Sequence, residues 1–301
     1  MLLRLAYDIQ FDIPAEVAMV ALLNVHSTRV SELLEPDELQ TEPELDVTHY
    51  TDSFGNHCVR FVAPPGHLRL SSTTLLEDSG TADEVNWSAR QWPVGELPNE
   101  TLRFLMNSRY CEVDRFSSIA FELFGQTDAG WSRVQAICNW VHNKVAFNYQ
   151  QARPTKTAMD VFTERVGVCR DYQHLAITLS RCQNIPARYV TGYVGDIRVP
   201  YSGPGDFSAW YEVFLDGRWM TMDARHNEPR MGRVLMATGR DAADVAITTS
   251  FGTTNLTNFY VDSYEVLEDG STVPSLPGTI AQGAVVTATR GGSQGAIQGF
   301  A

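Results

Sequence analysis

The residues of this chain that could most readily perform chemistry surround Cys169. Residues 165–177 read Arg-Val-Gly-Val-Cys-Arg-Asp-Tyr-Gln-His-Leu-Ala-Ile, and the pattern predicts a helix that begins at the cysteine. A helix N-terminus stabilises a nearby anion by about 0.3–1 kcal/mol. Arg170 adds positive charge, so both features favour the thiolate, which is the nucleophilic form of cysteine. A buried, inert cysteine would fit the same stretch, and these residues alone leave both interpretations open.

The other cysteines carry no comparable signal. The chain has five in all, an odd and sparse set that does not resemble a disulfide scaffold. No Cys-x-x-Cys pair or Cys/His cluster has the spacing of zinc ligands, so we expect no metal site. We also expect a reducing compartment, the cytoplasm. The four remaining cysteines are expected in two helices, in a strand, and in a stretch without polar neighbours: Cys138, Cys182, Cys58 and Cys111.

Composition excludes several classes of partner. The 301 residues carry a formal charge of −13, and residues 1–100 hold 17 acidic and 5 basic residues. Nucleic acids and anionic membrane surfaces require a basic face, so neither is expected as a partner. No window of about 18 apolar residues could span a membrane, and the N-terminus lacks the features of a signal peptide. No glycine-rich phosphate loop follows a predicted strand, so we expect no nucleotide cofactor.

The elements that must position Cys169 fall into two groups. Residues 3–13 alternate apolar and polar side chains, which is typical of a half-buried strand, and residues 17–25, 57–63 and 67–76 repeat the pattern. An antiparallel β-sandwich is therefore expected over residues 1–105.

Helical spacing follows the sandwich, and strand patterns follow the helices. Helices are predicted over residues 112–124, 130–147, 157–166 and 170–182, and strands over residues 187–194, 209–215 and 218–223. Helices followed by an antiparallel run of strands indicate an α+β fold. We expect a core domain over residues 106–268 and a Gly-rich C-terminal tail over residues 269–301.

The second group of elements resembles the bacterial transglutaminase-like superfamily. The motifs that carry this resemblance span about residues 130–252 and occur in the family's order: Ile137-Cys-Asn-Trp-Val-His, Ala158-Met-Asp-Val-Phe, Gly167-Val-Cys-Arg-Asp, Arg181-Cys-Gln-Asn-Ile-Pro-Ala-Arg-Tyr-Val-Thr-Gly-Tyr, Ala209-Trp-Tyr-Glu-Val, Gly217-Arg-Trp-Met-Thr-Met-Asp and Gly239-Arg-Asp-Ala-Ala-Asp-Val. The resemblance implies a papain-like α+β core, with a cysteine at a helix start packed on an antiparallel sheet. In bacteria a β-sandwich often precedes this core.

The resemblance also implies a Cys-His-Asp triad. The cysteine matches Cys169 and the aspartate matches Asp223, but the position that is normally histidine is Ser208. Serine cannot replace the imidazole, because its hydroxyl does not titrate near neutral pH and carries no positive charge.

Other histidines were weighed as a replacement base. His226 lies three residues after Asp223 and is either a surrogate base or a residue outside the site. His174 lies about 140° around the helix from Cys169, so we interpret it as a core residue. His142, on an earlier helix, is expected to be structural.

Two functions therefore remain open. The first is a cysteine peptidase, amidase or transglutaminase-like acyltransferase that forms a thioester at Cys169, with hydrolysis favoured over acyl transfer. The second is a catalytically degenerate protein of the same fold that binds a peptide or a protein partner. A peptide or protein ligand is expected in either case, and no cofactor is required by the residues identified.

Overall fold

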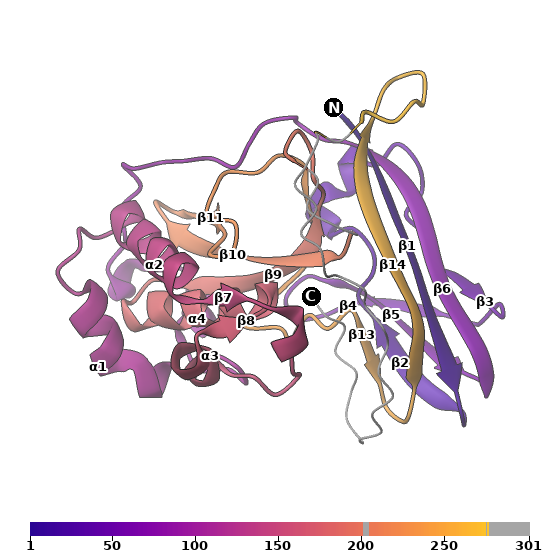
Figure 1. Ribbon diagram of the computed structural model, residues 1–301, viewed down its shortest axis with the longest axis horizontal. Helices are drawn as coiled ribbons and strands as arrows, with labels where there is room; N and C mark the ends of the chain where they lie inside the picture. Colours follow the sequence, from indigo (N-terminus) through magenta and orange to yellow (C-terminus); the bar gives the residue numbers. More distant parts are fainter. Residues whose placement is uncertain (201–204, 275, 277–301) are drawn as a thin grey trace.

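The computed structural model describes residues 1–200, 205–274 and 276, and it has the α+β fold class that the sequence predicts. A β-sandwich lies beside a second lobe in which helices pack on a sheet (Figure 1). Most of the expected Gly-rich tail, residues 269–301, lies outside the described residues.

Two antiparallel sheets form the sandwich. The first has the order β14 (Asn255–Val266), β1 (Leu2–Ile13), β6 (Gly66–Glu77), β3 (Gln40–Glu42). The second has the order β13 (Thr248–Ser250), β2 (Val17–Ala21), β5 (His57–Ala63), β4 (Thr48–Thr51). The predicted alternation of β1 is confirmed, because every second side chain from Leu3 to Ile13 is buried.

The strand pairing corrects the expected domain boundaries in one respect. β13 and β14 fall within residues 106–268, which were expected to form the core domain, yet both are strands of the sandwich. β14 pairs with β1 from Leu2↔Val266 to Asp12↔Asn255, and β13 pairs with β2. The alternation within residues 1–105 could not reveal this, because strand partners distant in sequence leave no local pattern.

The second lobe contains a four-stranded antiparallel sheet and four helices. The sheet has the order β11 (Arg218–Met222), β10 (Phe207–Leu215), β9 (Ala187–Val194), β12 (Arg233–Gly239). The helices are α1 (Val113–Phe124), α2 (Trp131–Lys144), α3 (Ala158–Glu164) and α4 (Cys169–Cys182). Short 3-10 segments cover Ser27–Glu32, Val94–Glu96, Asn99–Leu105 and Tyr149–Gln151. The helices predicted from the sequence are thus confirmed to within a few residues.

Helix α4 is the centre of this lobe, and every residue from Cys169 to Arg181 is buried. It packs against α1, α2 and α3 and against the sheet through β9 and β10. Because it is enclosed on all sides, its polar residues must find partners inside the protein. Arg181 does so near the end of the helix, where its guanidinium donates hydrogen bonds to the carbonyl groups of Ala187 and Arg240.

A small parallel ladder sets the start of α4. β7 (Ala146–Phe147) pairs with β8 (Val166–Gly167), which ends two residues before Cys169. The Asp171 carboxylate folds back to accept a hydrogen bond from the Val168 N–H at 3.0 Å. A Cβ atom at Gly167 would lie 2.6 Å from the Asp171 Cβ, so this turn requires glycine.

The apolar core of the sandwich extends into the second lobe. The buried cluster that fills the sandwich also contains Tyr193, Phe207 and Val234 from the sheet of the second lobe. The Phe207 ring contacts Tyr7 of β1 and Phe259 of β14, with ring centroids 6.2 Å and 6.0 Å apart. The sandwich therefore packs against the sheet of the second lobe at the start of β10.

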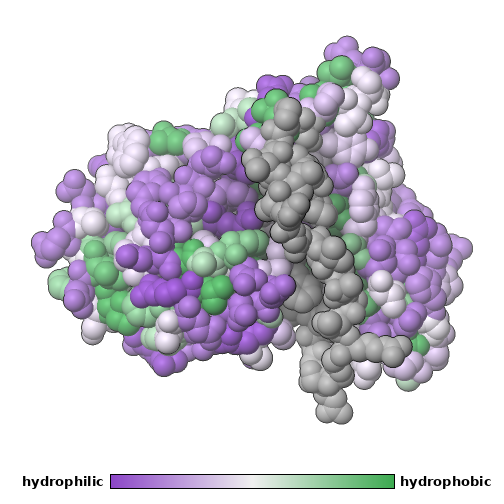
Figure 2. All heavy atoms as spheres, in the orientation of Figure 1, coloured by the Kyte–Doolittle hydropathy of each residue, from purple (hydrophilic) through white to green (hydrophobic). Residues whose placement is uncertain are grey.

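None of the helices in the described part of the chain combines the length and apolar character that a membrane crossing requires. Hydrophilic residues cover most of the visible face of the sandwich, as the outward half of alternating strands predicts (Figure 2).

We predict that residues 1–105 alone do not unfold cooperatively. This fragment lacks β13 and β14, so β1 loses a partner along its whole length. Because Leu2 lies opposite Val266, a short Gly-Ser linker from residue 267 to residue 1 should restore the β14–β1 pair as a hairpin. The linked protein, residues 246–267 followed by 1–105, should show a thermal transition by circular dichroism. A cooperative melt of residues 1–105 alone would contradict this prediction.

Candidate active site

Cys169 is the first residue of α4, and only 7% of it is exposed. Burial raises the pKa of its thiol to about 11, and the nearby Asp206 carboxylate adds to the rise. The Arg225 guanidinium, the backbone N–H of Arg170 and the Arg170 side chain oppose it. The sequence predicted that the helix start and Arg170 favour the thiolate, and the Arg170 backbone N–H and side chain do lower the pKa of the thiol. Burial outweighs them, so the resting cysteine is a thiol rather than a thiolate.

Asp206 is the acidic neighbour of Cys169, and it immediately precedes β10. Burial raises the pKa of its carboxyl to about 8, although the Phe207 backbone N–H, the Tyr149 hydroxyl and the Arg225 charge act to lower it. Its Oδ1 atom is buried and makes no hydrogen bond. A charge at Asp206 therefore opposes ionisation of the thiol.

Asp223 and His226 form an oriented carboxylate–imidazole pair after the end of β11. The His226 Nδ1 lies 2.8 Å from the Asp223 Oδ2. Asp223 is 6% exposed, and its carboxylate also accepts hydrogen bonds from Arg233 at 2.9 Å and from Gln173 at 3.0 Å. Burial raises the pKa of Asp223, but the Arg233 charge and the contacts with His226 more than offset this, so its pKa lies well below the usual value. The carboxylate stays ionised and directs Nε2 of the imidazole away from itself.

The Arg225 side chain forms a hydrogen bond with the His226 Nε2. Its Nη1 donates to the His226 Nε2 at 2.5 Å, and its guanidinium carbon lies 4.0 Å from the centre of the Phe147 ring. The backbone N–H of Arg225 donates to Asp223, and its carbonyl lies 2.8 Å from the His142 Nδ1. His142, expected to be structural, thus holds the segment that carries Arg225 and His226.

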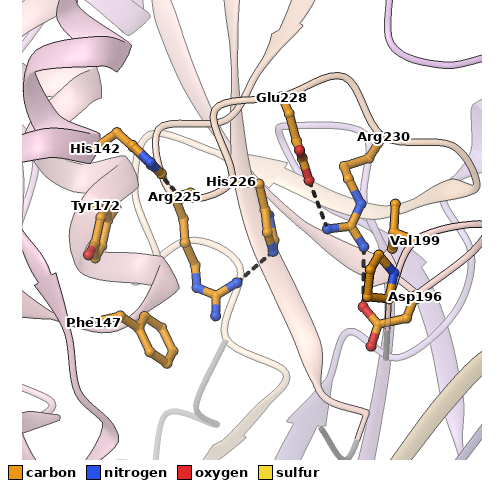
Figure 3. A pocket seen from close by; sticks show the side chains of 10 residues that line it. His142, Phe147, Tyr172, Asp196, Val199, Arg225, His226, Glu228 and Arg230 are labelled. Carbon is orange, nitrogen blue, oxygen red and sulfur yellow. Dashed lines mark hydrogen bonds and ion pairs between the residues drawn. The ribbon is translucent and has the colours of Figure 1, made fainter. Parts of the chain in front are cut away.

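A cleft of about 430 Å³ opens beside these residues. It is lined by aromatic and charged side chains, and Figure 3 shows the Arg225 head between Phe147 and His226. Cys169 is not among the residues that line this cleft. The imidazole and the guanidinium therefore face the open cleft, while the thiol lies at the buried start of α4.

Ser208 lies on β10 opposite Gly192 of β9 and is half-buried. Among the described residues its hydroxyl makes no hydrogen bond. The imidazole that Asp223 holds thus comes from the loop after β11 and not from β10.

The remaining histidine and cysteine near the site are structural. His174 is buried, its Nε2 accepts a hydrogen bond from the Ala242 N–H at 3.1 Å, and its ring stacks on Tyr110, so its interpretation as a core residue is confirmed. Cys138 lies 3.1 Å from the Tyr211 hydroxyl, and burial raises the pKa of its thiol to about 12. Such a thiol is inert at neutral pH.

Sequence reasoning missed three residues that shape the site. These residues are Asp206, Arg225 and Gln173, none of which the sequence pattern identified as part of the site. Gln173 lies one turn after Cys169, and its amide joins Asp223, the Ala209 carbonyl and the Ala224 N–H. Only its position one turn after Cys169 could have indicated that Gln173 belongs to the site. Its hydrogen-bond partners lie 36 to 51 positions away in the sequence and leave no local pattern.

We predict that Asp206→Asn increases the reactivity of Cys169. The substitution removes the negative charge that opposes thiolate formation, so the alkylation curve should move to lower pH and the rate at pH 8.5 should rise several-fold. The measurement is iodoacetamide labelling with peptide mapping from pH 6 to 11, with Asp12→Asn, an exposed position on β1, as the matched control. An unchanged curve would show that the Asp206 charge does not act on the thiol.

The chain is similar to known proteins in sequence and in fold. Residues 117–224 match the transglutaminase-like superfamily. The crystal structure of a proposed cysteine protease from Cytophaga hutchinsonii is 29% identical, covers 93% of both chains and superposes with a TM-score of 0.77. An uncharacterized protein from Mycobacterium leprae (strain TN) is 24% identical over 219 residues, which are 70% of this chain and 77% of that protein.

The matched segment begins in α1 and ends just after Asp223, so it includes α4 with Cys169 and the strands β9, β10 and β11. The likeness to the Cytophaga structure extends further, over the sandwich as well as the second lobe. Residues 117–224, which hold the candidate site up to Asp223, are thus similar to the transglutaminase-like superfamily.

Proposed function

We propose that this protein is a thiol-dependent amide hydrolase or acyltransferase of the transglutaminase-like superfamily that acts on peptide bonds through a Cys169 thioester. The observation that carries the proposal is the 2.8 Å contact between the Asp223 carboxylate and the His226 Nδ1. It supplies an oriented imidazole although the family's usual histidine position is Ser208. The described residues contain no group of three or more His, Cys, Asp or Glu side chains that could hold a metal.

In the proposed reaction the Cys169 sulfur attacks the amide carbonyl carbon. The thiol proton passes to the His226 Nε2, and the imidazolium then protonates the leaving nitrogen as the C–N bond breaks. Water or an amine gives a proton to His226 and attacks the thioester, and the C–S bond breaks to restore the thiol. Asp223 holds the imidazole with Nδ1 protonated and stabilises the imidazolium. Nε2 can act only after Arg225 has moved from it.

A second candidate function is peptide or protein binding without turnover. It is favoured by the burial of Cys169, by the high pKa of its thiol and by the hydrogen bond that Arg225 makes to the His226 Nε2. Both candidates use the same cleft and differ only in whether the thiol becomes acylated.

A reducing compartment such as the cytoplasm is part of the proposal. All five cysteines are free. Three of them, Cys111, Cys138 and Cys169, are held as buried thiols, since burial raises the pKa of each one.

We predict that His226→Ala lowers amide turnover by about 10²- to 10⁴-fold, the usual contribution of a general base. The assay follows peptide cleavage by mass spectrometry and traps the thioester with hydroxylamine as a hydroxamate. His67→Ala, an exposed position on β6, is the matched control and should retain full activity. Cys169→Ala should form no hydroxamate. Equal activity of the His226→Ala and His67→Ala variants would exclude His226 as the base.

Ser208→His separates the two candidate functions. If His226 already serves as the base, the substitution should change turnover little, because a second imidazole adds no missing step. If the protein is a binding protein that lost its base, Ser208→His should create hydroxamate formation that the unaltered protein lacks. If only the Ser208→His variant forms hydroxamate and the unaltered protein is inactive, the protein is a binding protein and not an enzyme.

A further inference from the structure

Arg225 is a cation in the cleft that lacks an ion-paired acidic side chain among the described residues. Within residues 1–200, 205–274 and 276 it forms no salt bridge. The acidic group that acts on the same thiol, Asp206, interacts with Arg225 only through its charge and makes no hydrogen bond to it. An arginine held in this way beside a cleft retains most of its capacity to bind an anion.

The acidic side chains of the cleft face its other arginine. Arg230 lies 3.3 Å from Asp196 and 3.8 Å from Glu228, so both acidic side chains of the lining share this one cation (Figure 3). Arg230 also donates to the Gly195 carbonyl. The two arginines and two acidic side chains of the lining balance in formal charge, and Arg225 is the arginine that forms no ion pair with either acidic side chain.

The unused donors of Arg225 have the geometry of a carboxylate site. Nη1 is bound to His226, whereas Nε is buried without a hydrogen-bond partner. A buried N–H group without a hydrogen-bond partner is unfavourable, so a ligand that satisfied it would be stabilised. The guanidinium packs on the Phe147 ring, with its carbon 4.0 Å from the ring centre. Turned toward a ligand, a guanidinium presents a planar fork that binds a carboxylate through two parallel hydrogen bonds.

We propose that the cleft recognises a carboxylate of its peptide ligand through Arg225, close to the amide that Cys169 would attack. The proposal rests on the proposed function in taking the ligand to be a peptide. The carboxylate belongs either to an acidic side chain or to the C-terminus of the peptide, and the two sources share the same chemistry at Arg225.

Carboxylate binding has a consequence for His226. A bound carboxylate competes with the His226 Nε2 for the Arg225 donors, and a charged acceptor outcompetes a neutral imidazole. Once Arg225 turns to the ligand, Nε2 is free to accept the thiol proton. An acidic ligand would thus both occupy the cleft and release the base.

The test measures binding to the Cys169→Ser variant by isothermal titration calorimetry, so that no turnover is required. Three peptides are compared: acetyl-Ala-Ala-Gln-Ala-amide, acetyl-Ala-Ala-Glu-Ala-amide and acetyl-Ala-Ala-Gln-Ala with a free C-terminus. We expect at least one carboxylate peptide to bind about tenfold more tightly than the neutral peptide, which is a typical effect for a charged hydrogen bond. The carboxylate peptide that binds more tightly shows whether the cleft prefers an acidic side chain or a C-terminus. Equal affinities of the two carboxylate peptides indicate that the cleft accepts both.

Substitutions at Arg225 test whether this residue causes the tighter binding of the carboxylate peptides. Added to the Cys169→Ser protein, Arg225→Gln should reduce the preference to near unity, and Arg225→Lys should retain part of it because the charge remains without the fork. Arg60→Gln, on an exposed face of β5, is the matched control and should preserve the preference. Thermal melts verify that each variant is folded.

Binding of neither carboxylate peptide above the neutral one, or a preference that survives Arg225→Gln, would overturn the inference. Failure of the proposed function would look different. In that case the carboxylate preference would persist in the Cys169→Ser protein, while the unaltered protein formed no hydroxamate with any of the three peptides.

Discussion

The buried carboxylate of Asp223 is the interaction on which the site depends. A buried anion is tolerated only where charges and hydrogen bonds compensate for lost hydration. Here Arg233 supplies the charge, Gln173 links the carboxylate to α4, and the backbone N–H groups of Arg225 and His226 fold the following loop around it. The Asp223 carboxylate thereby joins the helix that carries Cys169 to the loop that carries the imidazole, and its loss would leave the buried Arg233 with Asp83 as its remaining ion-pair partner.

The thiol and the imidazole are held in a resting state rather than a reactive one. Burial raises the pKa of Cys169 to about 11, and Arg225 occupies the nitrogen of His226 that would accept the proton. Asp206 acts on Cys169 in the same direction as burial. Burial and the Asp206 charge therefore oppose thiolate formation, and the hydrogen bond from Arg225 withholds the base, although the Arg225 charge itself favours the thiolate. Arg225 connects them, since it interacts electrostatically with Cys169 and Asp206 and is hydrogen-bonded to His226.

The sandwich participates in this arrangement through the shared core. Phe207 packs between β1 and β14, and it is flanked by Asp206 and Ser208 at the start of β10. Arg233, the counter-ion of Asp223, also pairs with Asp83 in the segment that leaves the sandwich, at 2.8 Å. Changes in the sandwich can thus reach the site through packing and through this ion pair, although no sandwich strand lines the cleft.

The sequence by itself determined the local structure: the alternation of β1, the four helices, the helix start at Cys169 and the motif order of the transglutaminase-like superfamily. These features depend on near neighbours in the chain, so periodicity and motif spacing record them. The tertiary structure decided what depends on distant pairs. It assigned β13 and β14 to the sandwich, buried Cys169 so that desolvation outweighed the helix terminus, and brought Asp206 and Arg225 near the thiol. The sequence pattern contains residue types and spacings, but burial and charge proximity arise only when segments far apart in the chain pack together.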